Sequence, residues 1–576
     1  MQDTHSAVRA RPLLPALRFE SDAFHLRESR IMGRQSAGHA FLRALVADAA
    51  GERLTGIGPN PASAEIFEAS VKAIDPRAQT HWASSHDLGA IALNGGLHLP
   101  DPSLGSYARL RQRIGCGAYS ITGLTHTISS DGAMGLLADL AIAPVMPWDA
   151  LICTSDAVKA SITTLLETQD DDLRWRLGTQ ARSPRPELPV IPLGVHCADY
   201  ADVDGAAASA RASLEIGADE IAFLFLGRLS FHAKAHPFPM YEALEAVARE
   251  SGKKIVLIQC GWFANSSIES AFKDGAQRFA PSIRHIWLDG AQEKARTCAW
   301  AASDVFISLS DNIQETFGLT IIEAMAAGKP VIASDWDGYR QTVRHAETGF
   351  LIPTFMPQAE VGDAYGLAYA SQAINYDIYI GIASQHVSID LRALRQAVRT
   401  LVDNPILRAI MGARGRAVAR RDFDWPVIMS SYRTLWAELA ERRSAAAAER
   451  RSAAAAEPHA MQRRTVAQQI NPFRLFATYP SSRLDFRSHV ALRSDGPNWR
   501  EVADHLLFSV SQGRRPGDAV FDAVVAALGA APAAVGALAA ALAITPDAVL
   551  CVVSMLAKWG VVELSNSGPL RSGPER

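Results

Sequence analysis

Residues 314–330 read QETFGLTIIEAMAAGKP and are predicted to form a loop that turns into a helix. The apolar run 305–309 before it is typical of a buried strand, because β-branched and aromatic residues are bounded by polar ones. Apolar residues then recur at helical spacing, Gly328 suits a left-handed cap, and Pro330 prevents the helix from continuing. A further strand begins at Val331. The stretch therefore belongs to a βαβ unit, whose helix N-terminus presents free amides to an anion.

Two carboxylates stand at the mouth of this unit, Glu315 before the helix and Glu323 within it. Eight residues of helical rise amount to roughly 12 Å, which is comparable to a diphosphate with a sugar on either side. A second interpretation stays open. Glu323 can form a capping box with Thr320, and Glu315 can be a solvated loop acid.

Two later segments strengthen the first interpretation, SDWDGYRQTV (334–343) and TGFLI (348–352). Together with residues 314–330 they resemble the E-x7-E donor site of family 4 retaining glycosyltransferases. The resemblance implies an α/β fold of the GT-B type, with two Rossmann-like domains facing a cleft. It is strongest over residues 190–353, weak in the first domain, and absent after about residue 440. Asp337-Gly338 and Gln341 depart from the commoner Gly-Gly and Glu of the family.

A second group of residues follows the predicted strand 223–226, namely Gly227, Arg228 and Lys234. Glycine at a strand end lets the backbone approach a ligand, and two cations beyond it can neutralise a diphosphate. In an unrelated protein such loop cations are mostly solvated. Here they are similar to the G-R-L…K motif of the family, which implies phosphate binding. The resemblance also places Gly290, after another strand, near the nucleotide base.

The resemblance implies a role for each residue of the central stretch. Glu315 faces the transferred sugar, and Glu323 holds the ribose hydroxyls of the nucleotide. The amides near Phe317, Gly318 and Leu319 stabilise the departing diphosphate with the two cations. The leaving phosphate oxygen takes the proton of the acceptor hydroxyl. No metal and no cofactor beyond the nucleotide sugar are expected, because cationic side chains take over the role of a metal.

In the first domain, residues 119–124 are predicted to form a strand that ends just before His126. Ligands lie beyond the carboxyl ends of parallel strands, so His126 can touch the donor sugar, as a histidine does in many family members. A structural histidine is the alternative. Residues 33–38 are interpreted as a loop under the donor phosphates, before a helix 39–49, although Arg34 can be an ordinary surface charge. Residues 91–96 are predicted to be a strand ending in a turn.

The chain divides into four predicted parts. Residues 1–205 form an acceptor domain and residues 206–440 a donor domain. Residues 441–458 contain an identical eight-residue repeat rich in alanine, arginine and glutamate, which predicts a helical linker. Residues 459–576 are predicted to form a small, mainly helical, winged-helix-like module. Residues 354–387 resemble an insertion, which either shapes acceptor specificity or is a surface excursion.

The C-terminal module is predicted to contain helices 521–528, 535–542 and 548–557 and a strand 561–564. A winged-helix module can bind DNA, with residues 545–556 as the recognition helix. That segment has no lysine or arginine, and residues 515–576 hold five acids against four bases. Because phosphate binding needs a basic face, no nucleic acid is expected. A protein partner or self-association is predicted instead.

Composition agrees with a large enzyme. The chain has 576 residues, 48% of them apolar, and a net charge of −3, so neither a nucleic-acid partner nor a polybasic membrane anchor is expected. Six scattered cysteines without C-x-x-C spacing predict reduced thiols in the cytoplasm. No run approaches the roughly 20 apolar residues of a membrane-spanning helix, so no transmembrane segment is expected.

The sequence thus predicts a retaining glycosyltransferase of the hexosyltransferase type, acting in polysaccharide or glycoconjugate synthesis on an unidentified acceptor. One alternative is a non-catalytic nucleotide-sugar-binding or regulatory protein that acts through its C-terminal module. The intact pair Glu315 and Glu323 argues against it. A glycogen-phosphorylase-like enzyme would share the fold, but no lysine context suggests a pyridoxal phosphate site.

Overall fold

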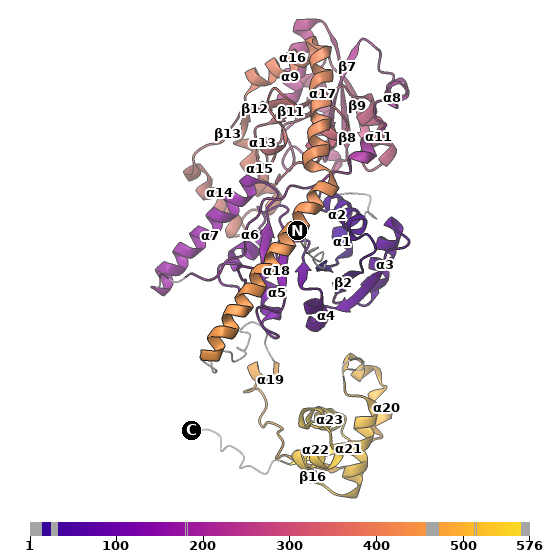
Figure 1. Cartoon of the computed structure of the whole chain (residues 1–576), viewed down its shortest axis with the longest axis vertical. Coiled ribbons are helices and arrows are strands. Elements are labelled where there is room, and N and C mark those ends of the chain that lie inside the picture. Colours follow the sequence, from indigo (N-terminus) through magenta and orange to yellow (C-terminus); the bar gives the residue numbers. More distant parts are fainter. Residues whose placement is uncertain are drawn as a thin grey trace, which may run out of the picture. The chain divides into compact units, whose positions relative to one another are not determined.

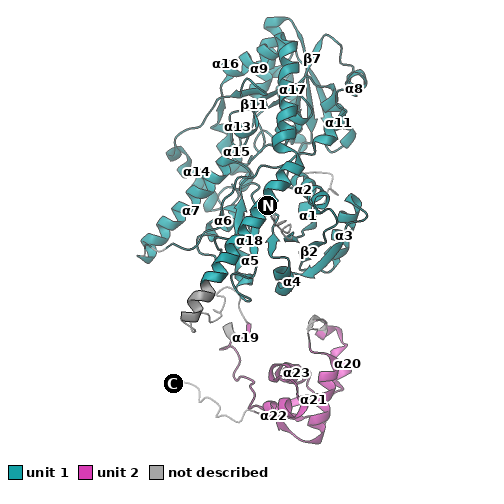
Figure 2. Ribbon diagram, in the orientation of Figure 1, with its two compact units in different colours: residues 1–466 teal, residues 467–576 magenta. Residues whose placement is uncertain are grey.

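The computed structural model describes residues 14–24, 33–178, 180, 182–456, 472–511, 513 and 515–565. The chain divides into two compact units, residues 1–466 and 467–576, which Figure 2 distinguishes by colour. The first unit holds two parallel sheets with helices around them (Figure 1).

The first sheet has the strand order β3-β2-β1-β4-β5-β6, and every pair in it is parallel. This is the order of a doubly wound Rossmann sheet, in which ligands bind beyond the carboxyl ends of the strands at the switch point between β1 and β4. Its strands are β1 (Ala16–Arg18), β2 (Leu54–Gly58), β3 (Thr80–Ser84), β4 (Gly96–His98), β5 (Ser120–Leu124) and β6 (Ala150–Ile152). Its helices are α1 (Ser21–Phe24), α2 (Gly33–Ala49), α3 (Ala62–Ile74), α4 (Leu88–Leu93), α5 (Leu104–Arg111), α6 (Asp131–Asp139) and α7 (Asp156–Leu177).

The second sheet repeats this topology in the order β12-β11-β10-β7-β8-β9, again with parallel pairs. Its strands are β7 (Glu220–Leu226), β8 (Lys254–Gly261), β9 (Arg284–Asp289), β10 (Val305–Ser308), β11 (Val331–Ser334) and β12 (Gly349–Ile352). The helices are η1 (Cys197–Tyr200), α8 (Ala207–Ser213), α9 (Phe238–Ser251), α10 (Ser266–Phe279), α11 (Glu293–Ala302), α12 (Leu319–Ala326), α13 (Tyr339–Thr342), α16 (Leu391–Asp403), α17 (Pro405–Val418) and η3 (Ala419–Phe423). Two Rossmann-like domains of this kind form the GT-B fold, so the predicted fold class is confirmed.

Between β12 and α16 the chain leaves the second sheet, and we call residues 354–389 the excursion. It consists of β13 (Thr354–Phe355), η2 (Ala359–Gly362), α14 (Asp363–Ala370), α15 (Tyr376–Gln385) and β14 (Ser388–Ile389). The two short strands pair antiparallel and close it at its base. In sequence the region shows little periodicity, yet the structure gives it two helices.

Helix α18 (Trp425–Ala456) returns the chain from the second domain to the first. Its aromatic side chains Tyr432 and Trp436 pack against His98 of the first sheet. The alanine-rich repeat is helical as predicted, and it continues α18 without a break through Ala456. Arg442 pairs with Glu187, and Arg443 donates to the Ser120 hydroxyl at 2.9 Å, so the start of the repeat is bound to the first domain. Residues 457 and 458 of the predicted linker lie outside the described residues.

Two local predictions for the first domain are wrong. Residues 33–38 are the first turns of α2 and not a loop. Gly38 is needed there for close packing, because a Cβ would lie 2.0 Å from the carbonyl oxygen of Ala23. Residues 88–93 form helix α4, capped by the Asp87 side chain, which accepts a hydrogen bond from the amide of Ala90 at 2.9 Å. A short apolar run does not by itself separate a strand from a helical turn, and here the cap decides.

The second unit is mainly helical, as predicted. It contains α19 (Pro472–Leu475), α20 (Trp499–Ala503), η4 (Leu506–Ser511), α21 (Asp518–Ala530), α22 (Val535–Leu542) and α23 (Pro546–Lys558). A small antiparallel sheet of order β16-β15-β17 joins β15 (His489–Leu492), β16 (Ala533–Ala534) and β17 (Val562–Ser565). The rings of Trp499, Phe521 and Trp559 stack in its core. Across the described residues of the whole chain, none of the helices is long and apolar enough to cross a bilayer.

Candidate functional site

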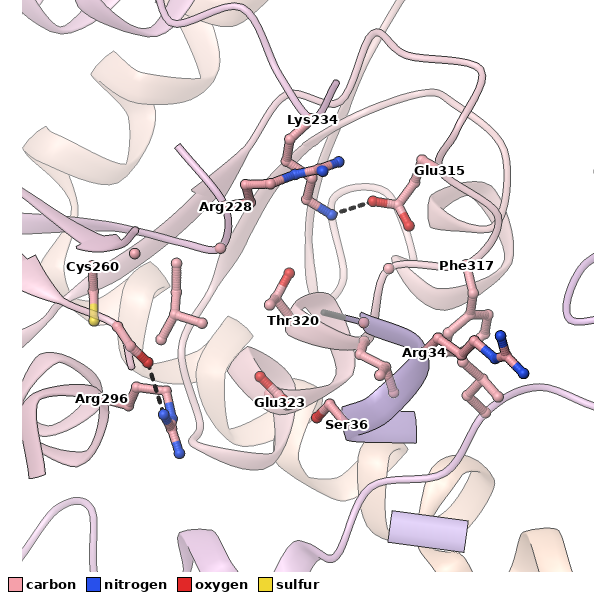
Figure 3. Close-up of a pocket in the computed structure, with 18 of the residues that line it drawn as sticks. Arg34, Ser36, Arg228, Lys234, Cys260, Arg296, Glu315, Phe317, Thr320 and Glu323 are labelled. Atoms are coloured by element: carbon pink, nitrogen blue, oxygen red, sulfur yellow. Dashed lines mark hydrogen bonds and ion pairs between the residues drawn. The ribbon is translucent and has the colours of Figure 1, made fainter. Parts of the chain in front are cut away.

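A cavity of about 490 Å³ lies between the two Rossmann-like domains (Figure 3). Its walls come from the carboxyl ends of the strands, which is where the topology places a ligand. All the residues that the sequence predicted for the site line this cavity, namely His126, Gly227, Arg228, Lys234, Gly290, Glu315, Phe317, Gly318, Leu319 and Glu323.

Three glycines let the ends of β7, β8 and β9 approach one another backbone to backbone. A Cβ on Gly261 would lie 1.9 Å from the carbonyl oxygen of Gly227, and one on Gly290 would lie 2.7 Å from the Cα of Gly261. Gly227 also has a φ of +148°. The floor of the cavity is therefore bare backbone. The sequence analysis missed Gly261, although a glycine ending the apolar strand 255–260 was a usable signal.

Arg228 and Lys234 enter the cavity from the loop after β7 (Figure 3). Arg228 donates to the carbonyl oxygen of Ala233 at 2.8 Å and to the side-chain oxygen of Gln314. Burial lowers the pKa of its guanidinium, and the charge of Asp377 partly offsets this effect. Lys234 forms an ion pair with Glu315. Burial opposes the charge of Lys234, but Glu315 outweighs burial and raises the pKa of the ammonium group, so both cations are charged.

Glu315 is held as a carboxylate by its surroundings. Burial raises its pKa, but Lys234 and the backbone amides of Phe317 and Thr316 outweigh burial, and the net pKa is lowered. The hydroxyl of Tyr339 also donates to Glu315 at 3.3 Å. Such a carboxylate is a weak base, because its proton affinity is already reduced by a cation and by amide donors.

Gly318 begins helix α12 in a conformation that only glycine fits. Its φ is +91°, and a Cβ would lie 2.0 Å from the ring of Tyr339. Because Gly318 is the N-cap, the capping box between Thr320 and Glu323 does not form. The buried hydroxyl oxygen of Thr320 makes no hydrogen bond within the described structure. Both side chains are therefore available to the cavity.

Glu323 lies farther along the cavity, on the side of Arg296 and Ser36 (Figure 3). Burial raises its pKa to about 7, while the charges of Arg296 and Lys234 act in the opposite direction. Arg296 of α11 is fixed by its bond to the carbonyl oxygen of Gly290 at 2.7 Å. The sequence analysis missed Arg296, because a single arginine in an amphipathic helix is indistinguishable from a solvated charge.

The first domain contributes His126, Arg34 and Ser36 to the opposite wall. The His126 ring meets the carbonyl oxygen of Pro100 at 3.0 Å, and burial lowers the pKa of its imidazole to about 4. His126 is thus neutral near pH 7. Arg34 lies 3.4 Å from Glu20, has 38% of its side chain exposed, and also lines the cavity. Residues 33–38 are helical and not a loop, yet Gly33, Arg34 and Ser36 line the cavity.

The positions that depart from the family pattern touch the first domain. Asp337 accepts a hydrogen bond from the Ser155 hydroxyl at 2.9 Å. Gln341 accepts from the amide of Asp156 at 2.7 Å and donates to its carboxylate at 2.6 Å. We call Ser155, Asp156, Asp337 and Gln341 together the interdomain clasp. A glutamate in place of Gln341 would meet the like charge of Asp156, which gives a physical reason for the amide.

The part of the chain that the structure describes contains no group of three or more histidine, cysteine, aspartate or glutamate side chains arranged to hold a metal ion.

Comparison with known proteins assigns a family model to the second domain. Residues 207–362 match the model described as "Glycosyl transferases group 1". The chain is 23% identical over 362 residues to the phosphatidyl-myo-inositol mannosyltransferase of Mycobacterium tuberculosis strain H37Rv, covering 60% of this chain and 84% of that protein. It is 30% identical over 170 residues to the D-inositol 3-phosphate glycosyltransferase of Nocardia farcinica, covering 29% of this chain and 37% of that protein.

Solved structures show likeness at lower identity. HepE from Anabaena in complex with UDP aligns at 15% identity and a TM-score of 0.46, covering 72% of this chain and 98% of that one. A glycosyltransferase from Rickettsia africae aligns at 15% identity and a TM-score of 0.46, covering 70% and 94%. The residues that match the family model include Arg228, Lys234, Glu315 and Glu323, which line the cavity.

Proposed function

We propose that this chain is a glycosyltransferase that moves a sugar from a nucleotide-sugar donor to an acceptor hydroxyl with retention of the anomeric configuration. One observation carries the proposal. Arg228, Lys234 and Glu315 converge with the N-terminus of α12 in a cavity between two Rossmann-like domains. Cations, free amides and a fixed carboxylate in one site suit a diphosphate joined to a sugar.

The chemistry follows from charge. Breaking the bond between the anomeric carbon and phosphate leaves positive charge on the sugar and negative charge on the diphosphate, as in other oxocarbenium-like displacements. Arg228, Lys234 and the amides at the start of α12 stabilise the negative charge where it develops. Because these groups are already fixed by the fold, little reorganisation is needed. Glu315 faces the positively charged sugar.

Retention follows if the acceptor attacks from the face that the diphosphate leaves. Glu315 is a poor base, because Lys234 and backbone amides lower its pKa. The leaving phosphate oxygen gains negative charge during the reaction and is the better proton acceptor. We therefore assign the acceptor proton to the leaving group and give Glu315 an electrostatic role. The anomeric configuration of the product, measured by NMR coupling constants, tests retention.

Glu323 and Arg296 are proposed to bind the nucleoside. Glu323 lies beyond Thr320 on α12, on the side of the cavity that also holds Arg296 and the bare backbone of Gly290. A carboxylate there can accept hydrogen bonds from the two hydroxyls of a ribose. Burial raises the pKa of Glu323 to about 7, and hydrogen bonds from the ribose hydroxyls should lower it, because such bonds to the charged form favour ionisation.

The proposal needs no metal, because Arg228 and Lys234 supply two fixed positive charges for the diphosphate. Transfer should therefore continue at an undiminished rate in a chelator such as EDTA. A rate that falls with EDTA and returns with Mg²⁺ would assign part of this role to a metal.

The acceptor class is proposed from the relatives alone. Those described above are named for transfer to phosphatidyl-myo-inositol and to D-inositol 3-phosphate. At this identity we carry over the general class, synthesis of a glycoconjugate or polysaccharide, and not the individual acceptor. All six cysteines are free, which agrees with a cytoplasmic location. We further propose that the second unit binds a protein partner or a second copy of the chain, and no nucleic acid.

Differential scanning fluorimetry against a panel of nucleoside diphosphates and nucleotide sugars tests the donor site. One nucleotide should raise the melting temperature of wild type, and Arg228→Ala should abolish the shift. Lys254→Ala is the matched control, since Lys254 pairs with Asp219 on the surface and should keep the shift. If no nucleotide stabilises wild type, the proposal fails. Binding without turnover of the donor would favour the non-catalytic alternative.

A further inference from the structure

The excursion 354–389 is fixed to the donor side of the cavity. The side chain of Asn312, just before Gln314 and Glu315, donates to the carbonyl oxygen of Ile380 at 3.4 Å and to that of His232 at 2.6 Å. Ile380 is fully buried, and a Cβ on Gly381 would lie 3.2 Å from His232. Helix α15 therefore packs on the loop of the second domain that carries Arg228 and Lys234.

The same excursion reaches the first domain through two tyrosine hydroxyls. Tyr376 lies 2.8 Å from the Ser129 hydroxyl and 3.3 Å from that of Thr127. Tyr369 accepts a hydrogen bond from the amide of Asp131, at the start of α6, at 2.9 Å. In Figure 1, α14 and α15 lie between the second sheet and α6. The excursion thus connects the second domain to the first.

Tyr376 also contacts the proposed donor site, through Gln314. The side-chain nitrogen of Gln314 donates to the Tyr376 hydroxyl at 3.1 Å, and its oxygen accepts from Arg228. Arg228 has only donors, so the oxygen of the Gln314 amide faces Arg228 and the nitrogen faces the Tyr376 hydroxyl, which accepts. Tyr376 thus holds the far end of the side chain whose oxygen binds Arg228. Tyr376 does not line the cavity, whereas Gln314 and Arg228 do.

A chain of contacts therefore runs from Ser129 in the first domain through Tyr376 and Gln314 to Arg228. From this chain we propose that Tyr376 is a positioning residue. It orients Arg228 through Gln314 when the first domain is docked, so that the excursion couples closure of the cleft to stabilisation of the leaving diphosphate. The inference rests on the proposed function.

The electrostatic surroundings support this arrangement independently. The charge of Asp377, next to Tyr376, acts on both Arg228 and His232. The excursion therefore reaches Arg228 through a hydrogen-bonded tyrosine and through a neighbouring negative charge. A mere surface excursion would supply neither.

The test compares Tyr376→Phe with Tyr365→Phe in the full chain. The Tyr365 hydroxyl meets His386 within the excursion at 3.2 Å, so its loss removes a hydroxyl of the same kind without touching the bridge. Hydrogen exchange, measured by mass spectrometry, should be faster over residues 127–133 in Tyr376→Phe and unchanged in Tyr365→Phe. Hydrolysis of UDP-glucose or GDP-mannose, whichever wild type accepts, should show kcat reduced about tenfold in Tyr376→Phe, the size expected for one hydrogen bond to a charged group's partner.

The split between kinetic parameters separates positioning from a general structural loss. KM for the donor should change less than about threefold, because orientation of Arg228 matters most as charge develops on the leaving group. In a double variant with Gln314→Ala, removal of the Tyr376 hydroxyl should cost no further activity, since it acts through Gln314. Independent, multiplicative losses would overturn the inference.

The two proposals fail in different ways. If wild type hydrolyses a nucleotide sugar and Tyr376→Phe matches Tyr365→Phe in kcat and in hydrogen exchange, the inference fails and the proposed function stands. If wild type neither binds nor hydrolyses any donor of the panel, the proposed function fails and takes this inference with it.

Discussion

At the scale of single residues, Glu323 is the most informative side chain of the cavity. It sits on a helix whose first turn faces the proposed diphosphate, yet burial raises its pKa to about 7. A carboxyl group with this pKa is half protonated near neutral pH. Glu315, in the loop just before this helix, is kept charged by Lys234. Two glutamates eight positions apart therefore have opposite electrostatic surroundings.

Stability should depend on pH through Glu323. The carboxyl ionises near 4.5 in the unfolded chain and near 7 in the fold, so between these values the unfolded state binds fewer protons. The free energy of unfolding then falls as the pH rises through this window. Glu323→Gln removes this dependence. The melting temperature of the variant minus that of wild type should therefore increase by a few degrees from pH 5 to pH 8. Scanning fluorimetry over a pH series measures the difference.

Subtracting the wild-type melting temperature removes the contributions of other buried carboxyl groups. Burial also raises the pKa values of Asp311 and Asp337 to about 7, but both groups are present in both proteins and their contributions cancel. A difference in melting temperature that stays constant from pH 5 to pH 8 would show that Glu323 is not the group with the raised pKa.

At the scale of elements, the interdomain clasp joins the loop after β11 to the start of α7. Asp337 has a φ of +44°, an uncommon conformation for a residue other than glycine, while it accepts the hydrogen bond of Ser155. Gln341 meets Asp156 through both ends of its amide. A neighbouring bond, from the Thr154 hydroxyl to the carbonyl oxygen of Thr316 at 3.1 Å, links the same region directly to the loop beside Glu315.

Gln341→Glu should weaken this clasp by placing two carboxylates together. Because both side chains are exposed, the expected loss in free energy of unfolding is only about 0.5–1 kcal/mol, and salt should reduce it. Denaturant unfolding at low and high ionic strength measures this loss. Adding Asp156→Asn to the same chain should restore stability, because the repulsion disappears. Equal stability of Gln341→Glu and wild type at low salt would contradict the clasp.

The same region shows what the sequence could and could not predict. Glycine and cations at the end of a buried strand identified Gly227, Arg228 and Lys234, because that pattern is local. Arg296 was not predicted, because its hydrogen bond to Gly290 and the effect of its charge on Glu323 arise only in the folded chain. The partners of Asp337 and Gln341 lie more than 180 residues away in sequence, at Ser155 and Asp156. The excursion showed little periodicity, and its tyrosines come together only in the fold, where Tyr369 stacks on Tyr379 and lies beside Tyr376.

At the scale of the whole molecule, the two units have separate hydrophobic cores. The core of the second unit is formed by residues 490–562, among them Trp499, Phe521 and Trp559, and it contains no residue of the first unit. Within the described part of the chain, the residues that line the cavity belong to the first unit. Donor binding and the function of the C-terminal module should therefore be separable.

A chain that ends at Ala456 should bind the donor nucleotide as wild type does, with a Kd within about twofold, because every lining residue and all of α18 remain. A chain that ends at Leu439 is the control. It loses the bonds of Arg442 to Glu187 and of Arg443 to Ser120, and its melting temperature should fall. Titration calorimetry and scanning fluorimetry measure both. Loss of donor binding in the chain ending at Ala456 would mean that residues 457–576 contribute to the site, so the module would then act in catalysis and not in a separate interaction.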